Sequence, residues 1–274
     1  MSFLAQMAAQ SAARVREARA ARTEEELLAA CRAAPAPPLL RLDRFDLIAE
    51  IKRHSPAEGA LADEVDVAVR ARGYGAAGAA AVSVLTEPAR FGGSLADLGA
   101  AACALHARGV PAMRKDFLVE PWQVLEARAA GAGGVLLIVA MLSDEVLGEM
   151  IAAAREQGLF TLLEAFDATD LERAAKLLKN APGEPPLLVG VNTRDLRTLA
   201  VDPARLAALA PQLPPGFPAV AESGLHDAAD AAAAAALGYR LALVGTALMR
   251  AERPAQLAAA MIAAGRAAVS KEEA

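Results

Sequence analysis

The chain has 274 residues, of which 55% are hydrophobic and 22% are charged, and its net charge at pH 7 is −5. This length suits one large domain or two small ones, and the negative charge provides no basic field for nucleic acid or an anionic membrane. The two isolated cysteines, Cys31 and Cys103, indicate neither a disulfide framework nor a zinc site, so a reducing, cytoplasmic location is expected.

The first 45 residues are predicted to form a helical extension that packs on a main domain spanning residues 46–274. The opening segment, MSFLAQMAAQSAARVREARA, lacks the charged start and continuous apolar block of a signal peptide. No apolar run approaches the roughly 20 residues of a membrane span. Arginines without an acidic residue before Glu17 leave a transit peptide as the alternative to an amphipathic helix. A proline-rich stretch, APAPPL at 34–39, follows as a link.

Beyond this link, short runs rich in Val, Ile and Leu alternate with longer alanine-rich segments that carry charges at helical spacing. The predicted strands are 47–51, 80–86, 111–116, 134–139, 160–165, 187–192, 219–223 and 241–246. Their starts are 22 to 33 residues apart, which is the length of a strand, a helix and two loops.

Three of the intervening segments carry clear helix signals. The segment 143–158 begins at a Ser cap and ends at Gly158, the segment 167–181 begins at Asp167 and ends before Pro182, and 227–238 is nearly all alanine. Continuous apolar strands are typical of a parallel sheet covered on both faces. Eight such units close most economically into a (β/α)₈ TIM barrel. A doubly wound open sheet is the competing fold, but neither GxGxxG nor GxxxxGK[ST] follows the first strand.

Polar or small residues gather at the carboxyl ends of the predicted strands. They are Glu50 and Lys52, Lys115 and Asp116, Glu164, Asn192, Glu222 and Ser223, and Gly245 and Thr246. In a TIM barrel all these ends share one rim, where active sites are built. Each residue also has a structural alternative: Glu50 and Lys52 as a plain ion pair, Asn192 as a turn residue, and Glu222 as a buttress of the barrel. The three histidines show no ligand spacing, so no metal site is expected.

Two glycine-containing runs indicate a phosphate site. The runs AESGL at 221–225 and LVGTAL at 243–248 place small residues just beyond the seventh and eighth predicted strands. Glycines at these positions let the backbone approach a ligand and direct N–H groups at it, and phosphate binding after these two strands is frequent in this barrel. The pair of runs therefore predicts a phosphorylated substrate.

In eight segments the chain resembles the indole-3-glycerol phosphate synthase family. The matching segments are LIAEIKRHSP, AVSVLTEPARFGGS, PAMRKDFLVEPWQV, GVLLIVAMLSD, LLEAFDATDL, VGVNTRDLRTLAVD, VAESGL and LVGTALMR, in order from residue 47 to residue 250. The resemblance implies a cofactor-free lyase of tryptophan biosynthesis that closes 1-(2-carboxyphenylamino)-1-deoxyribulose 5-phosphate to indole-3-glycerol phosphate, releasing CO₂ and water. The small phosphorylated substrate is the implied partner, and the protein is expected to be a monomer or a homodimer.

The resemblance also implies a role for each site residue. Lys115 is the general acid at the ribulose carbonyl, and Glu164 and Glu50 are the acid/base carboxylates of later steps. Lys52 and Asn192 are also implied to be catalytic residues. The residues implied to bind the substrate are Ser55, Phe91, Arg194, Glu222, Ser223, Gly224, Gly245 and Thr246. Two positions depart from the family pattern: His54 where a small residue or lysine is common, and Phe166 where many members have histidine. Neither is a predicted catalytic residue.

Three rival functions remain on the same sequence. A Schiff-base aldolase would use Lys115 as a covalent nucleophile. A related phosphosugar isomerase or synthase would want a different acid/base pair. A non-catalytic phosphate-binding barrel would retain the phosphate loops alone, yet Lys115 and Glu164 are both present.

Overall fold

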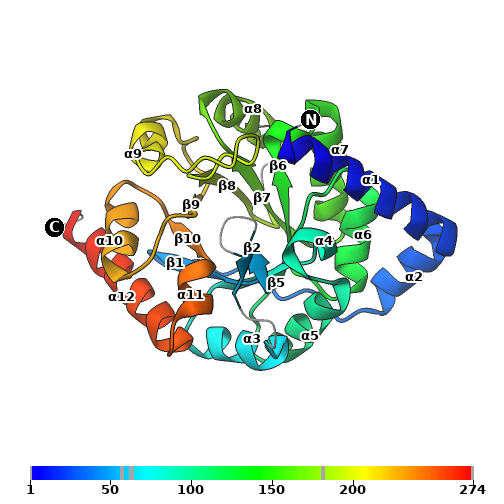
Figure 1. Cartoon of the computed structure of the whole chain (residues 1–274), viewed down its shortest axis with the longest axis horizontal. Coiled ribbons are helices and arrows are strands. Elements are labelled where there is room, and N and C mark those ends of the chain that lie inside the picture. Colours follow the sequence, from blue (N-terminus) through cyan, green and yellow to red (C-terminus); the bar gives the residue numbers. More distant parts are fainter. Residues whose placement is uncertain (1, 56–58, 62–64, 180–182, 273–274) are drawn as a thin grey trace.

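The structure, a computed structural model, describes residues 2–55, 59–61, 65–179 and 183–272. Eight parallel strands form a closed barrel in the order β1-β10-β9-β8-β7-β6-β5-β4 (Figure 1). They are β1 (Asp46–Ile51), β4 (Ala81–Leu85), β5 (Ala112–Lys115), β6 (Gly134–Ile138), β7 (Phe160–Ala165), β8 (Leu187–Asn192), β9 (Ala219–Glu222) and β10 (Leu241–Val244). The predicted TIM barrel is thereby confirmed, and each strand overlaps the run predicted for it.

The barrel closes because β1 pairs in parallel with both β10 and β4. Asp46 lies opposite Leu241 on one side, and Ile48 lies opposite Ala81 on the other. A small antiparallel sheet of β2 (His54–Ser55) and β3 (Gly59–Ala60) follows β1. Nothing in the sequence patterns predicted this hairpin, because its strands are too short to show any periodicity.

Helices surround the barrel and cover the outer face of its strands (Figure 1). They are α3 (Val67–Ala76), α4 (Pro88–Phe91), α5 (Leu95–His106), α6 (Pro121–Ala129), α7 (Asp144–Glu156), α8 (Ala168–Lys179), α9 (Arg205–Leu209), α10 (Ala228–Ala236), α11 (Thr246–Arg250) and α12 (Pro254–Glu272), with 3₁₀ turns η1 (Val139–Met141) and η2 (Ala210–Gln212). The helix predicted over 167–181 is observed as α8, and residues 180–181 of that prediction lie outside the described part.

Alternation along the strands separates two apolar cores. In β1, Leu47, Ala49 and Ile51 belong to the core between the strands and the outer helices, whereas Ile48 belongs to the core inside the barrel. Successive strand side chains point to opposite faces, so Glu50 shares the inner face with Ile48. Apolar side chains fill both faces of the middle of β1, whereas Asp46 stands at its amino end and Glu50 near its carboxyl end.

The N-terminal segment forms α1 (Phe3–Ala21) and α2 (Glu24–Ala33). Thr23 begins α2 with a capping box, in which its hydroxyl accepts from the Glu26 N–H and Glu26 reaches back to the Thr23 N–H. Leu4 and Met7 of α1 join the inner core, and Val15 packs in a cluster with Trp122 of α6. These contacts place the helices against the barrel; the predicted domain boundary at residue 45 stays a prediction. No helix within the described ranges is both long and apolar enough to cross a membrane.

Candidate active site at the carboxyl ends of the strands

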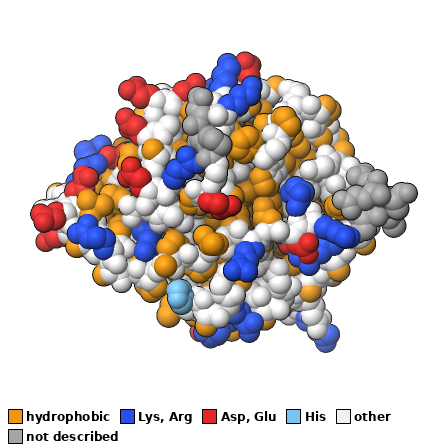
Figure 2. All heavy atoms as spheres, turned by 180° about the vertical axis from the view of Figure 1, so that it is seen from behind, with side chains coloured by type: hydrophobic (Ala, Val, Ile, Leu, Met, Phe, Trp, Pro, Cys, Tyr) orange, Lys and Arg blue, Asp and Glu red, His pale blue; other side chains and the backbone are white. Residues whose placement is uncertain are grey.

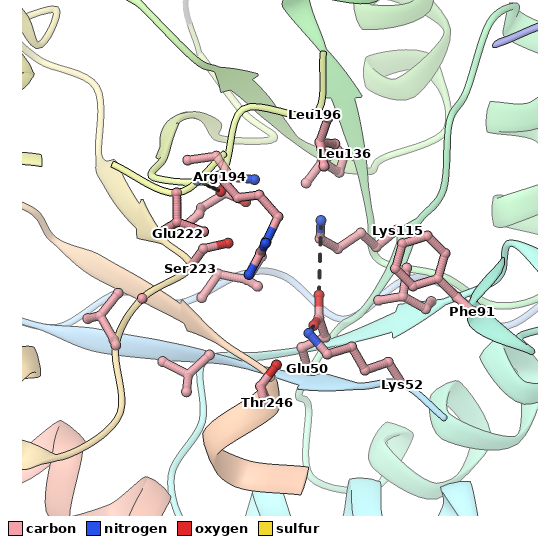
Figure 3. A pocket seen from close by; sticks show the side chains of 18 of the residues that line it. Glu50, Lys52, Phe91, Lys115, Leu136, Arg194, Leu196, Glu222, Ser223 and Thr246 are labelled. Atoms are coloured by element: carbon pink, nitrogen blue, oxygen red, sulfur yellow. Dashed lines mark hydrogen bonds and ion pairs between the residues drawn. The ribbon is translucent and has the colours of Figure 1, made fainter. Parts of the chain in front are cut away.

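A cavity of about 340 Å³ opens at the carboxyl ends of the barrel strands. Eleven of the thirteen site residues predicted from the sequence line it: Glu50, Lys52, Phe91, Lys115, Asn192, Arg194, Glu222, Ser223, Gly224, Gly245 and Thr246. They come from positions 50 to 246 of the chain, and barrel closure brings them to one mouth, as Figure 3 shows for most of them. The size is that of a pocket for a small organic ligand.

Two lysines and two carboxylates form a compact cluster on the floor of this cavity. Lys52 Nζ lies 2.7 Å from Glu50 Oε1, and Lys115 Nζ lies 4.0 Å from Glu50 Oε2 (Figure 3). Lys115 Nζ is also 3.5 Å from Glu164 Oε2, which accepts a 3.1 Å hydrogen bond from Asn192 Nδ2. Glu164 is completely buried and contacts Lys115 and Asn192, which line the cavity.

The cluster sets the protonation of its members. Burial alone would lower the pKa of Lys115, but the carboxylates of Glu164, Glu50 and Glu222 outweigh it and raise that pKa above the usual value. Burial raises the pKa of Glu50, yet Lys52 and Lys115 together bring it below the ordinary 4.5. At neutral pH Lys115 is therefore an ammonium ion and Glu50 is a carboxylate.

Gly245 makes room for the ion pair. A Cβ at this position would lie 2.1 Å from Glu50 Oε1 and 3.0 Å from Lys52 Nζ. A contact of 2.1 Å does not occur between unbonded atoms, so any larger residue would push the carboxylate aside. The absence of a side chain here lets Glu50 and Lys52 meet directly above the end of β10.

The loop after β9, where the sequence predicts part of a phosphate site, contains residues with positive φ at the wall of the cavity. Ser223 and Gly224 have φ values of 64° and 73°, so two successive residues adopt the left-handed conformation. Such turns direct neighbouring N–H groups into one concavity, a nest that suits an oxyanion. Gly245 and Thr246 line the same cavity. Its occupant stays a prediction.

An apolar wall stands beside the lysines. The ring of Phe117 lies 6.2 Å from that of Phe91 and 5.9 Å from that of Phe3 on α1, the latter edge to face. Leu136 and Leu196 continue this wall. On the other side of the cavity, Arg194 extends its guanidinium into the cavity beside Ser223 (Figure 3). The cavity thus joins an apolar region to cationic side chains.

A buried polar network holds the strand end that carries Lys115. Arg114 Nη2 contacts Asp116 Oδ2 at 3.2 Å, and the Thr86 hydroxyl donates to the same oxygen at 2.9 Å. Arg14 of α1 contacts Asp116 Oδ1 at 2.6 Å and Glu87 Oε1 at 3.4 Å. The residues on both sides of Lys115 are therefore fixed, so the lysine projects from a rigid segment.

Several residues of the site were not predicted from the sequence. His226, one of the three histidines without ligand spacing, lines the cavity, and so do the apolar residues Phe117, Leu196 and Leu199. Phe117 follows the conspicuous Lys115–Asp116 pair directly, which was a usable signal. Ser55 lies in β2, and its side chain is outside the described part of the structure. Among the residues that the structure describes, no three His, Cys, Asp or Glu side chains are grouped as a metal would require; the absence of a cofactor stays a prediction.

Comparison with known proteins gives consistent matches over most of the chain. A family model described as indole-3-glycerol phosphate synthase matches residues 4–261. The chain is 47% identical over 227 residues to the indole-3-glycerol phosphate synthase of Parafrankia sp. (strain EAN1pec), covering 83% of this chain and 81% of that relative. It is 48% identical over 213 residues to that of Nocardioides sp. (strain ATCC BAA-499 / JS614), covering 78% of each.

Among solved structures, 3-hexulose-6-phosphate synthase from Salmonella typhimurium superposes with a TM-score of 0.58. The match covers 83% of this chain and 99% of that one, at 16% identity. At this identity the likeness shows the barrel fold alone.

Proposed function

The chain belongs to the indole-3-glycerol phosphate synthase family, and from this premise we propose how its cavity carries out the family's reaction. That reaction is a carboxy-lyase step of tryptophan biosynthesis, and it acts on a phosphorylated small molecule. The proposed substrate is 1-(2-carboxyphenylamino)-1-deoxyribulose 5-phosphate, which loses CO₂ and water as its ring closes to indole-3-glycerol phosphate. The reaction requires an acid at the ribulose carbonyl and groups that remove and return protons. It also requires residues that bind the phosphate and the carboxylate of the substrate.

Lys115 is the general acid in this proposal. The single observation that carries it is the placement of Lys115 Nζ 3.5 Å from Glu164 Oε2 and 4.0 Å from Glu50 Oε2, at the floor of the cavity. Two carboxylates keep the amine protonated, and a protonated amine polarises a carbonyl oxygen and delivers a proton as the aromatic carbon attacks. Glu164 and Glu50 then serve as the acid/base carboxylates of the later dehydration.

The remaining residues position the substrate. The backbone nest at Ser223 and Gly224, together with Gly245 and Thr246, takes the phosphate. Arg194 and Lys52 hold the carboxylate of the aromatic ring and the charges that develop, and the apolar wall with Phe91 packs on the ring. When the phosphate and the carboxylate of the substrate are both held, the aromatic ring carbon lies next to the carbonyl carbon that it attacks.

A Schiff-base aldolase is the second candidate, because it would also place a lysine inside a barrel. Its lysine must be an unprotonated amine to attack a carbonyl. The raised pKa of Lys115 disfavours that form at neutral pH, with burial opposed by the carboxylates of Glu164, Glu50 and Glu222. Borohydride added with substrate traps a covalent adduct for an aldolase, and we expect none.

The direct test is a fluorescence assay for indole formation from the carboxyphenylamino-ribulose phosphate with purified protein. We expect turnover without added metal or nucleotide cofactor. Absence of the indole product from a correctly folded protein would refute the proposal, and so would a borohydride-trapped lysine adduct.

The cellular setting is proposed on charge and cysteine content. The net charge of −5 and the interspersed acidic, basic and apolar side chains on the face seen in Figure 2 offer no wide basic surface there. Nucleic acid and membrane are accordingly excluded from the proposed partners. A cytoplasmic monomer or homodimer is proposed, and light scattering on the purified protein measures which of the two forms.

A further inference from the structure

Two completely buried carboxyl groups lie on either side of Gly190. Glu164 of β7 is the register partner of Gly190 in β8, and Glu222 of β9 is the register partner of Asn192. A Cβ on Gly190 would lie 1.9 Å from Glu222 Oε1, so the Glu222 carboxyl occupies the space that this glycine leaves. The barrel therefore brings Glu222 across β8 toward Glu164.

The described residues supply too few hydrogen-bond donors for two carboxylates at this place. Glu164 Oε2 accepts from Asn192 Nδ2, but no side chain or backbone group in the described part of the chain donates a hydrogen bond to Glu164 Oε1 or to either oxygen of Glu222. One ammonium ion, Lys115, faces the pair, and its Nζ is already 3.5 Å from Glu164 and 4.0 Å from Glu50. An ionised carboxylate left without donors in a buried place costs several kcal/mol.

A single proton removes this conflict. When one of the two carboxyl groups is protonated, its O–H donates to the other, and only one negative charge remains beside Lys115. Carboxylates that share a site in this manner do not both ionise, because each disfavours the charge of the other. Glu50 differs from them, since Lys52 lies 2.7 Å away and neutralises its charge.

We propose that Glu164 and Glu222 bind one proton between them at neutral pH, and that Glu222, as the neutral acid, positions Glu164 for catalysis. The neutral acid donates its hydrogen bond to Glu164 and holds that carboxylate against Lys115 and Asn192. Glu222 is a positioning residue, because it acts through Glu164. This catalytic consequence rests on the proposed function, whereas the bound proton does not.

The pKa of Glu222 agrees with this arrangement. Burial first, and the charge of Glu164 next, raise the pKa of Glu222 well above 4.5; Lys115 opposes the change and Glu50 adds to it. Lys115 keeps its own raised pKa, since Glu164 and Glu50 contribute more to it than Glu222 does.

Infrared difference spectroscopy detects the proton without any turnover. The full chain at pH 7, without substrate, is compared with Glu222→Gln, which has the same shape but no carboxyl group. We expect the carbonyl stretch of a buried carboxylic acid in the unmodified chain and its loss in Glu222→Gln. Glu50→Gln is the matched control and is expected to retain the band, because the carboxyl that it removes is ionised.

Two infrared outcomes overturn the proposal: no carboxylic-acid band in the unmodified chain, or a band that survives in Glu222→Gln. Loss of the band in Glu50→Gln also overturns it, since the proton would then lie on Glu50. Circular dichroism confirms that each variant is folded. A band obtained from a protein that forms no indole product would refute the proposed function and leave the shared proton standing.

Turnover tests the positioning role separately. An amide at position 222 still donates a hydrogen bond to Glu164, whereas alanine leaves Glu164 without this donor. We expect kcat of Glu222→Gln to exceed that of Glu222→Ala by at least about tenfold, with similar KM values. If both variants lose kcat equally, the charge of Glu222 is what matters, and the neutral-acid assignment is wrong.

Discussion

At the scale of single residues, the site depends on neutralised charges that hold the ammonium group of Lys115 at the cavity. Lys115 is buried yet charged because carboxylates lie 3.5 Å and 4.0 Å from its Nζ. The positions of both carboxylates are fixed, since Glu164 also accepts a hydrogen bond from Asn192 and Glu50 forms an ion pair with Lys52. This arrangement fixes the ammonium ion and leaves its protons available to a substrate.

The first prediction concerns Lys115 itself. Lys115→Ala should lower kcat by about 10²–10⁴-fold, the usual contribution of a general acid, with little change in substrate affinity. Lys176→Ala is the matched control, because Lys176 is an exposed residue whose ion pair with Glu172 lies on the surface of α8. Steady-state kinetics and substrate titration measure both effects. Near-normal kcat in Lys115→Ala would show that the assigned role is wrong.

The second prediction concerns the space left by Gly245. Gly245→Ala places a methyl group where Glu50 Oε1 lies, and the flexible ends of Glu50 and Lys52 can move away at low cost to folding. We therefore expect kcat/KM to fall by about 10²-fold while the free energy of unfolding changes by no more than about 1 kcal/mol.

Gly73→Ala is the control for the same substitution. Gly73 lies in α3, and a Cβ there meets nothing within 4 Å. Alanine should raise stability by about 0.5–1 kcal/mol and leave kcat/KM unchanged. Equal activity of Gly245→Ala and Gly73→Ala would contradict the packing argument at Gly245.

At the scale of elements, α1 is connected to the active-site loops by charge as well as by apolar contact. Arg14 reaches Asp116 after β5 and Glu87 before α4, and Phe3 packs edge to face on Phe117. Asp116 and Glu87 are buried, and Glu87 also accepts from three backbone N–H groups at the start of α4. One arginine of the N-terminal helix thus joins two loops that border the cavity.

The third prediction follows from this contact. Arg14→Met keeps most of the apolar stem but removes the guanidinium, so Asp116 and Glu87 each lose one partner in a buried place. We expect the free energy of unfolding, measured with urea, to fall by about 1–3 kcal/mol. Arg16→Met, on the exposed face of α1, should change it by less than about 0.5 kcal/mol. Equal stability of the two variants would mean that α1 is held by apolar packing alone.

At the scale of the whole molecule, one closed sheet carries the site, and several carboxylates have their pKa lowered in the folded state. Burial opposes the shift in each case, but Lys52 and Lys115 lower the pKa of Glu50, Arg53 that of Asp97, and Arg197 that of Asp195. Each pair contributes stability at pH values above the unfolded pKa, 4.5 for Glu and 3.8 for Asp. That contribution is lost as the pH falls through the lower, folded pKa.

The fourth prediction is therefore a loss of stability in acid. From pH 7 to pH 5 the free energy of unfolding should rise by up to about 1.4 kcal/mol per pH unit, because the folded Glu164–Glu222 pair holds a proton that the unfolded chain lacks. It should then fall by on the order of a few kcal/mol as the pH is taken below about 4. The stability gap between the unmodified chain and Glu50→Gln should shrink over the same acidic range. Urea unfolding at a series of pH values measures both. A gap that widens in acid would contradict the ion pairing of Glu50.

The order and position of the strands were predictable because each strand has a local hydrophobic pattern in the sequence. Val, Ile and Leu runs with helical segments between them recur along the chain, and eight parallel units have one economical way to close. The same reasoning placed Glu50, Lys115 and Glu222 on one rim, since each stands at a strand end. β7 and β8 have the predicted bounds, whereas the other six strands differ from the predicted runs by one or two residues at an end, because pairing register, not composition, decides where a ladder stops.

The amino-acid order alone thus specified the barrel, its parallel strands and the set of polar residues that meet at its mouth. The packed chain decided how these residues pair: Glu164 buried behind Lys115, Glu222 placed over Gly190, and Arg14 bound to Asp116 across a separation of 102 residues. Such pairings depend on the direction of each side chain and on contacts between distant segments. Neither is encoded in local periodicity, so they appear only when the sheet closes.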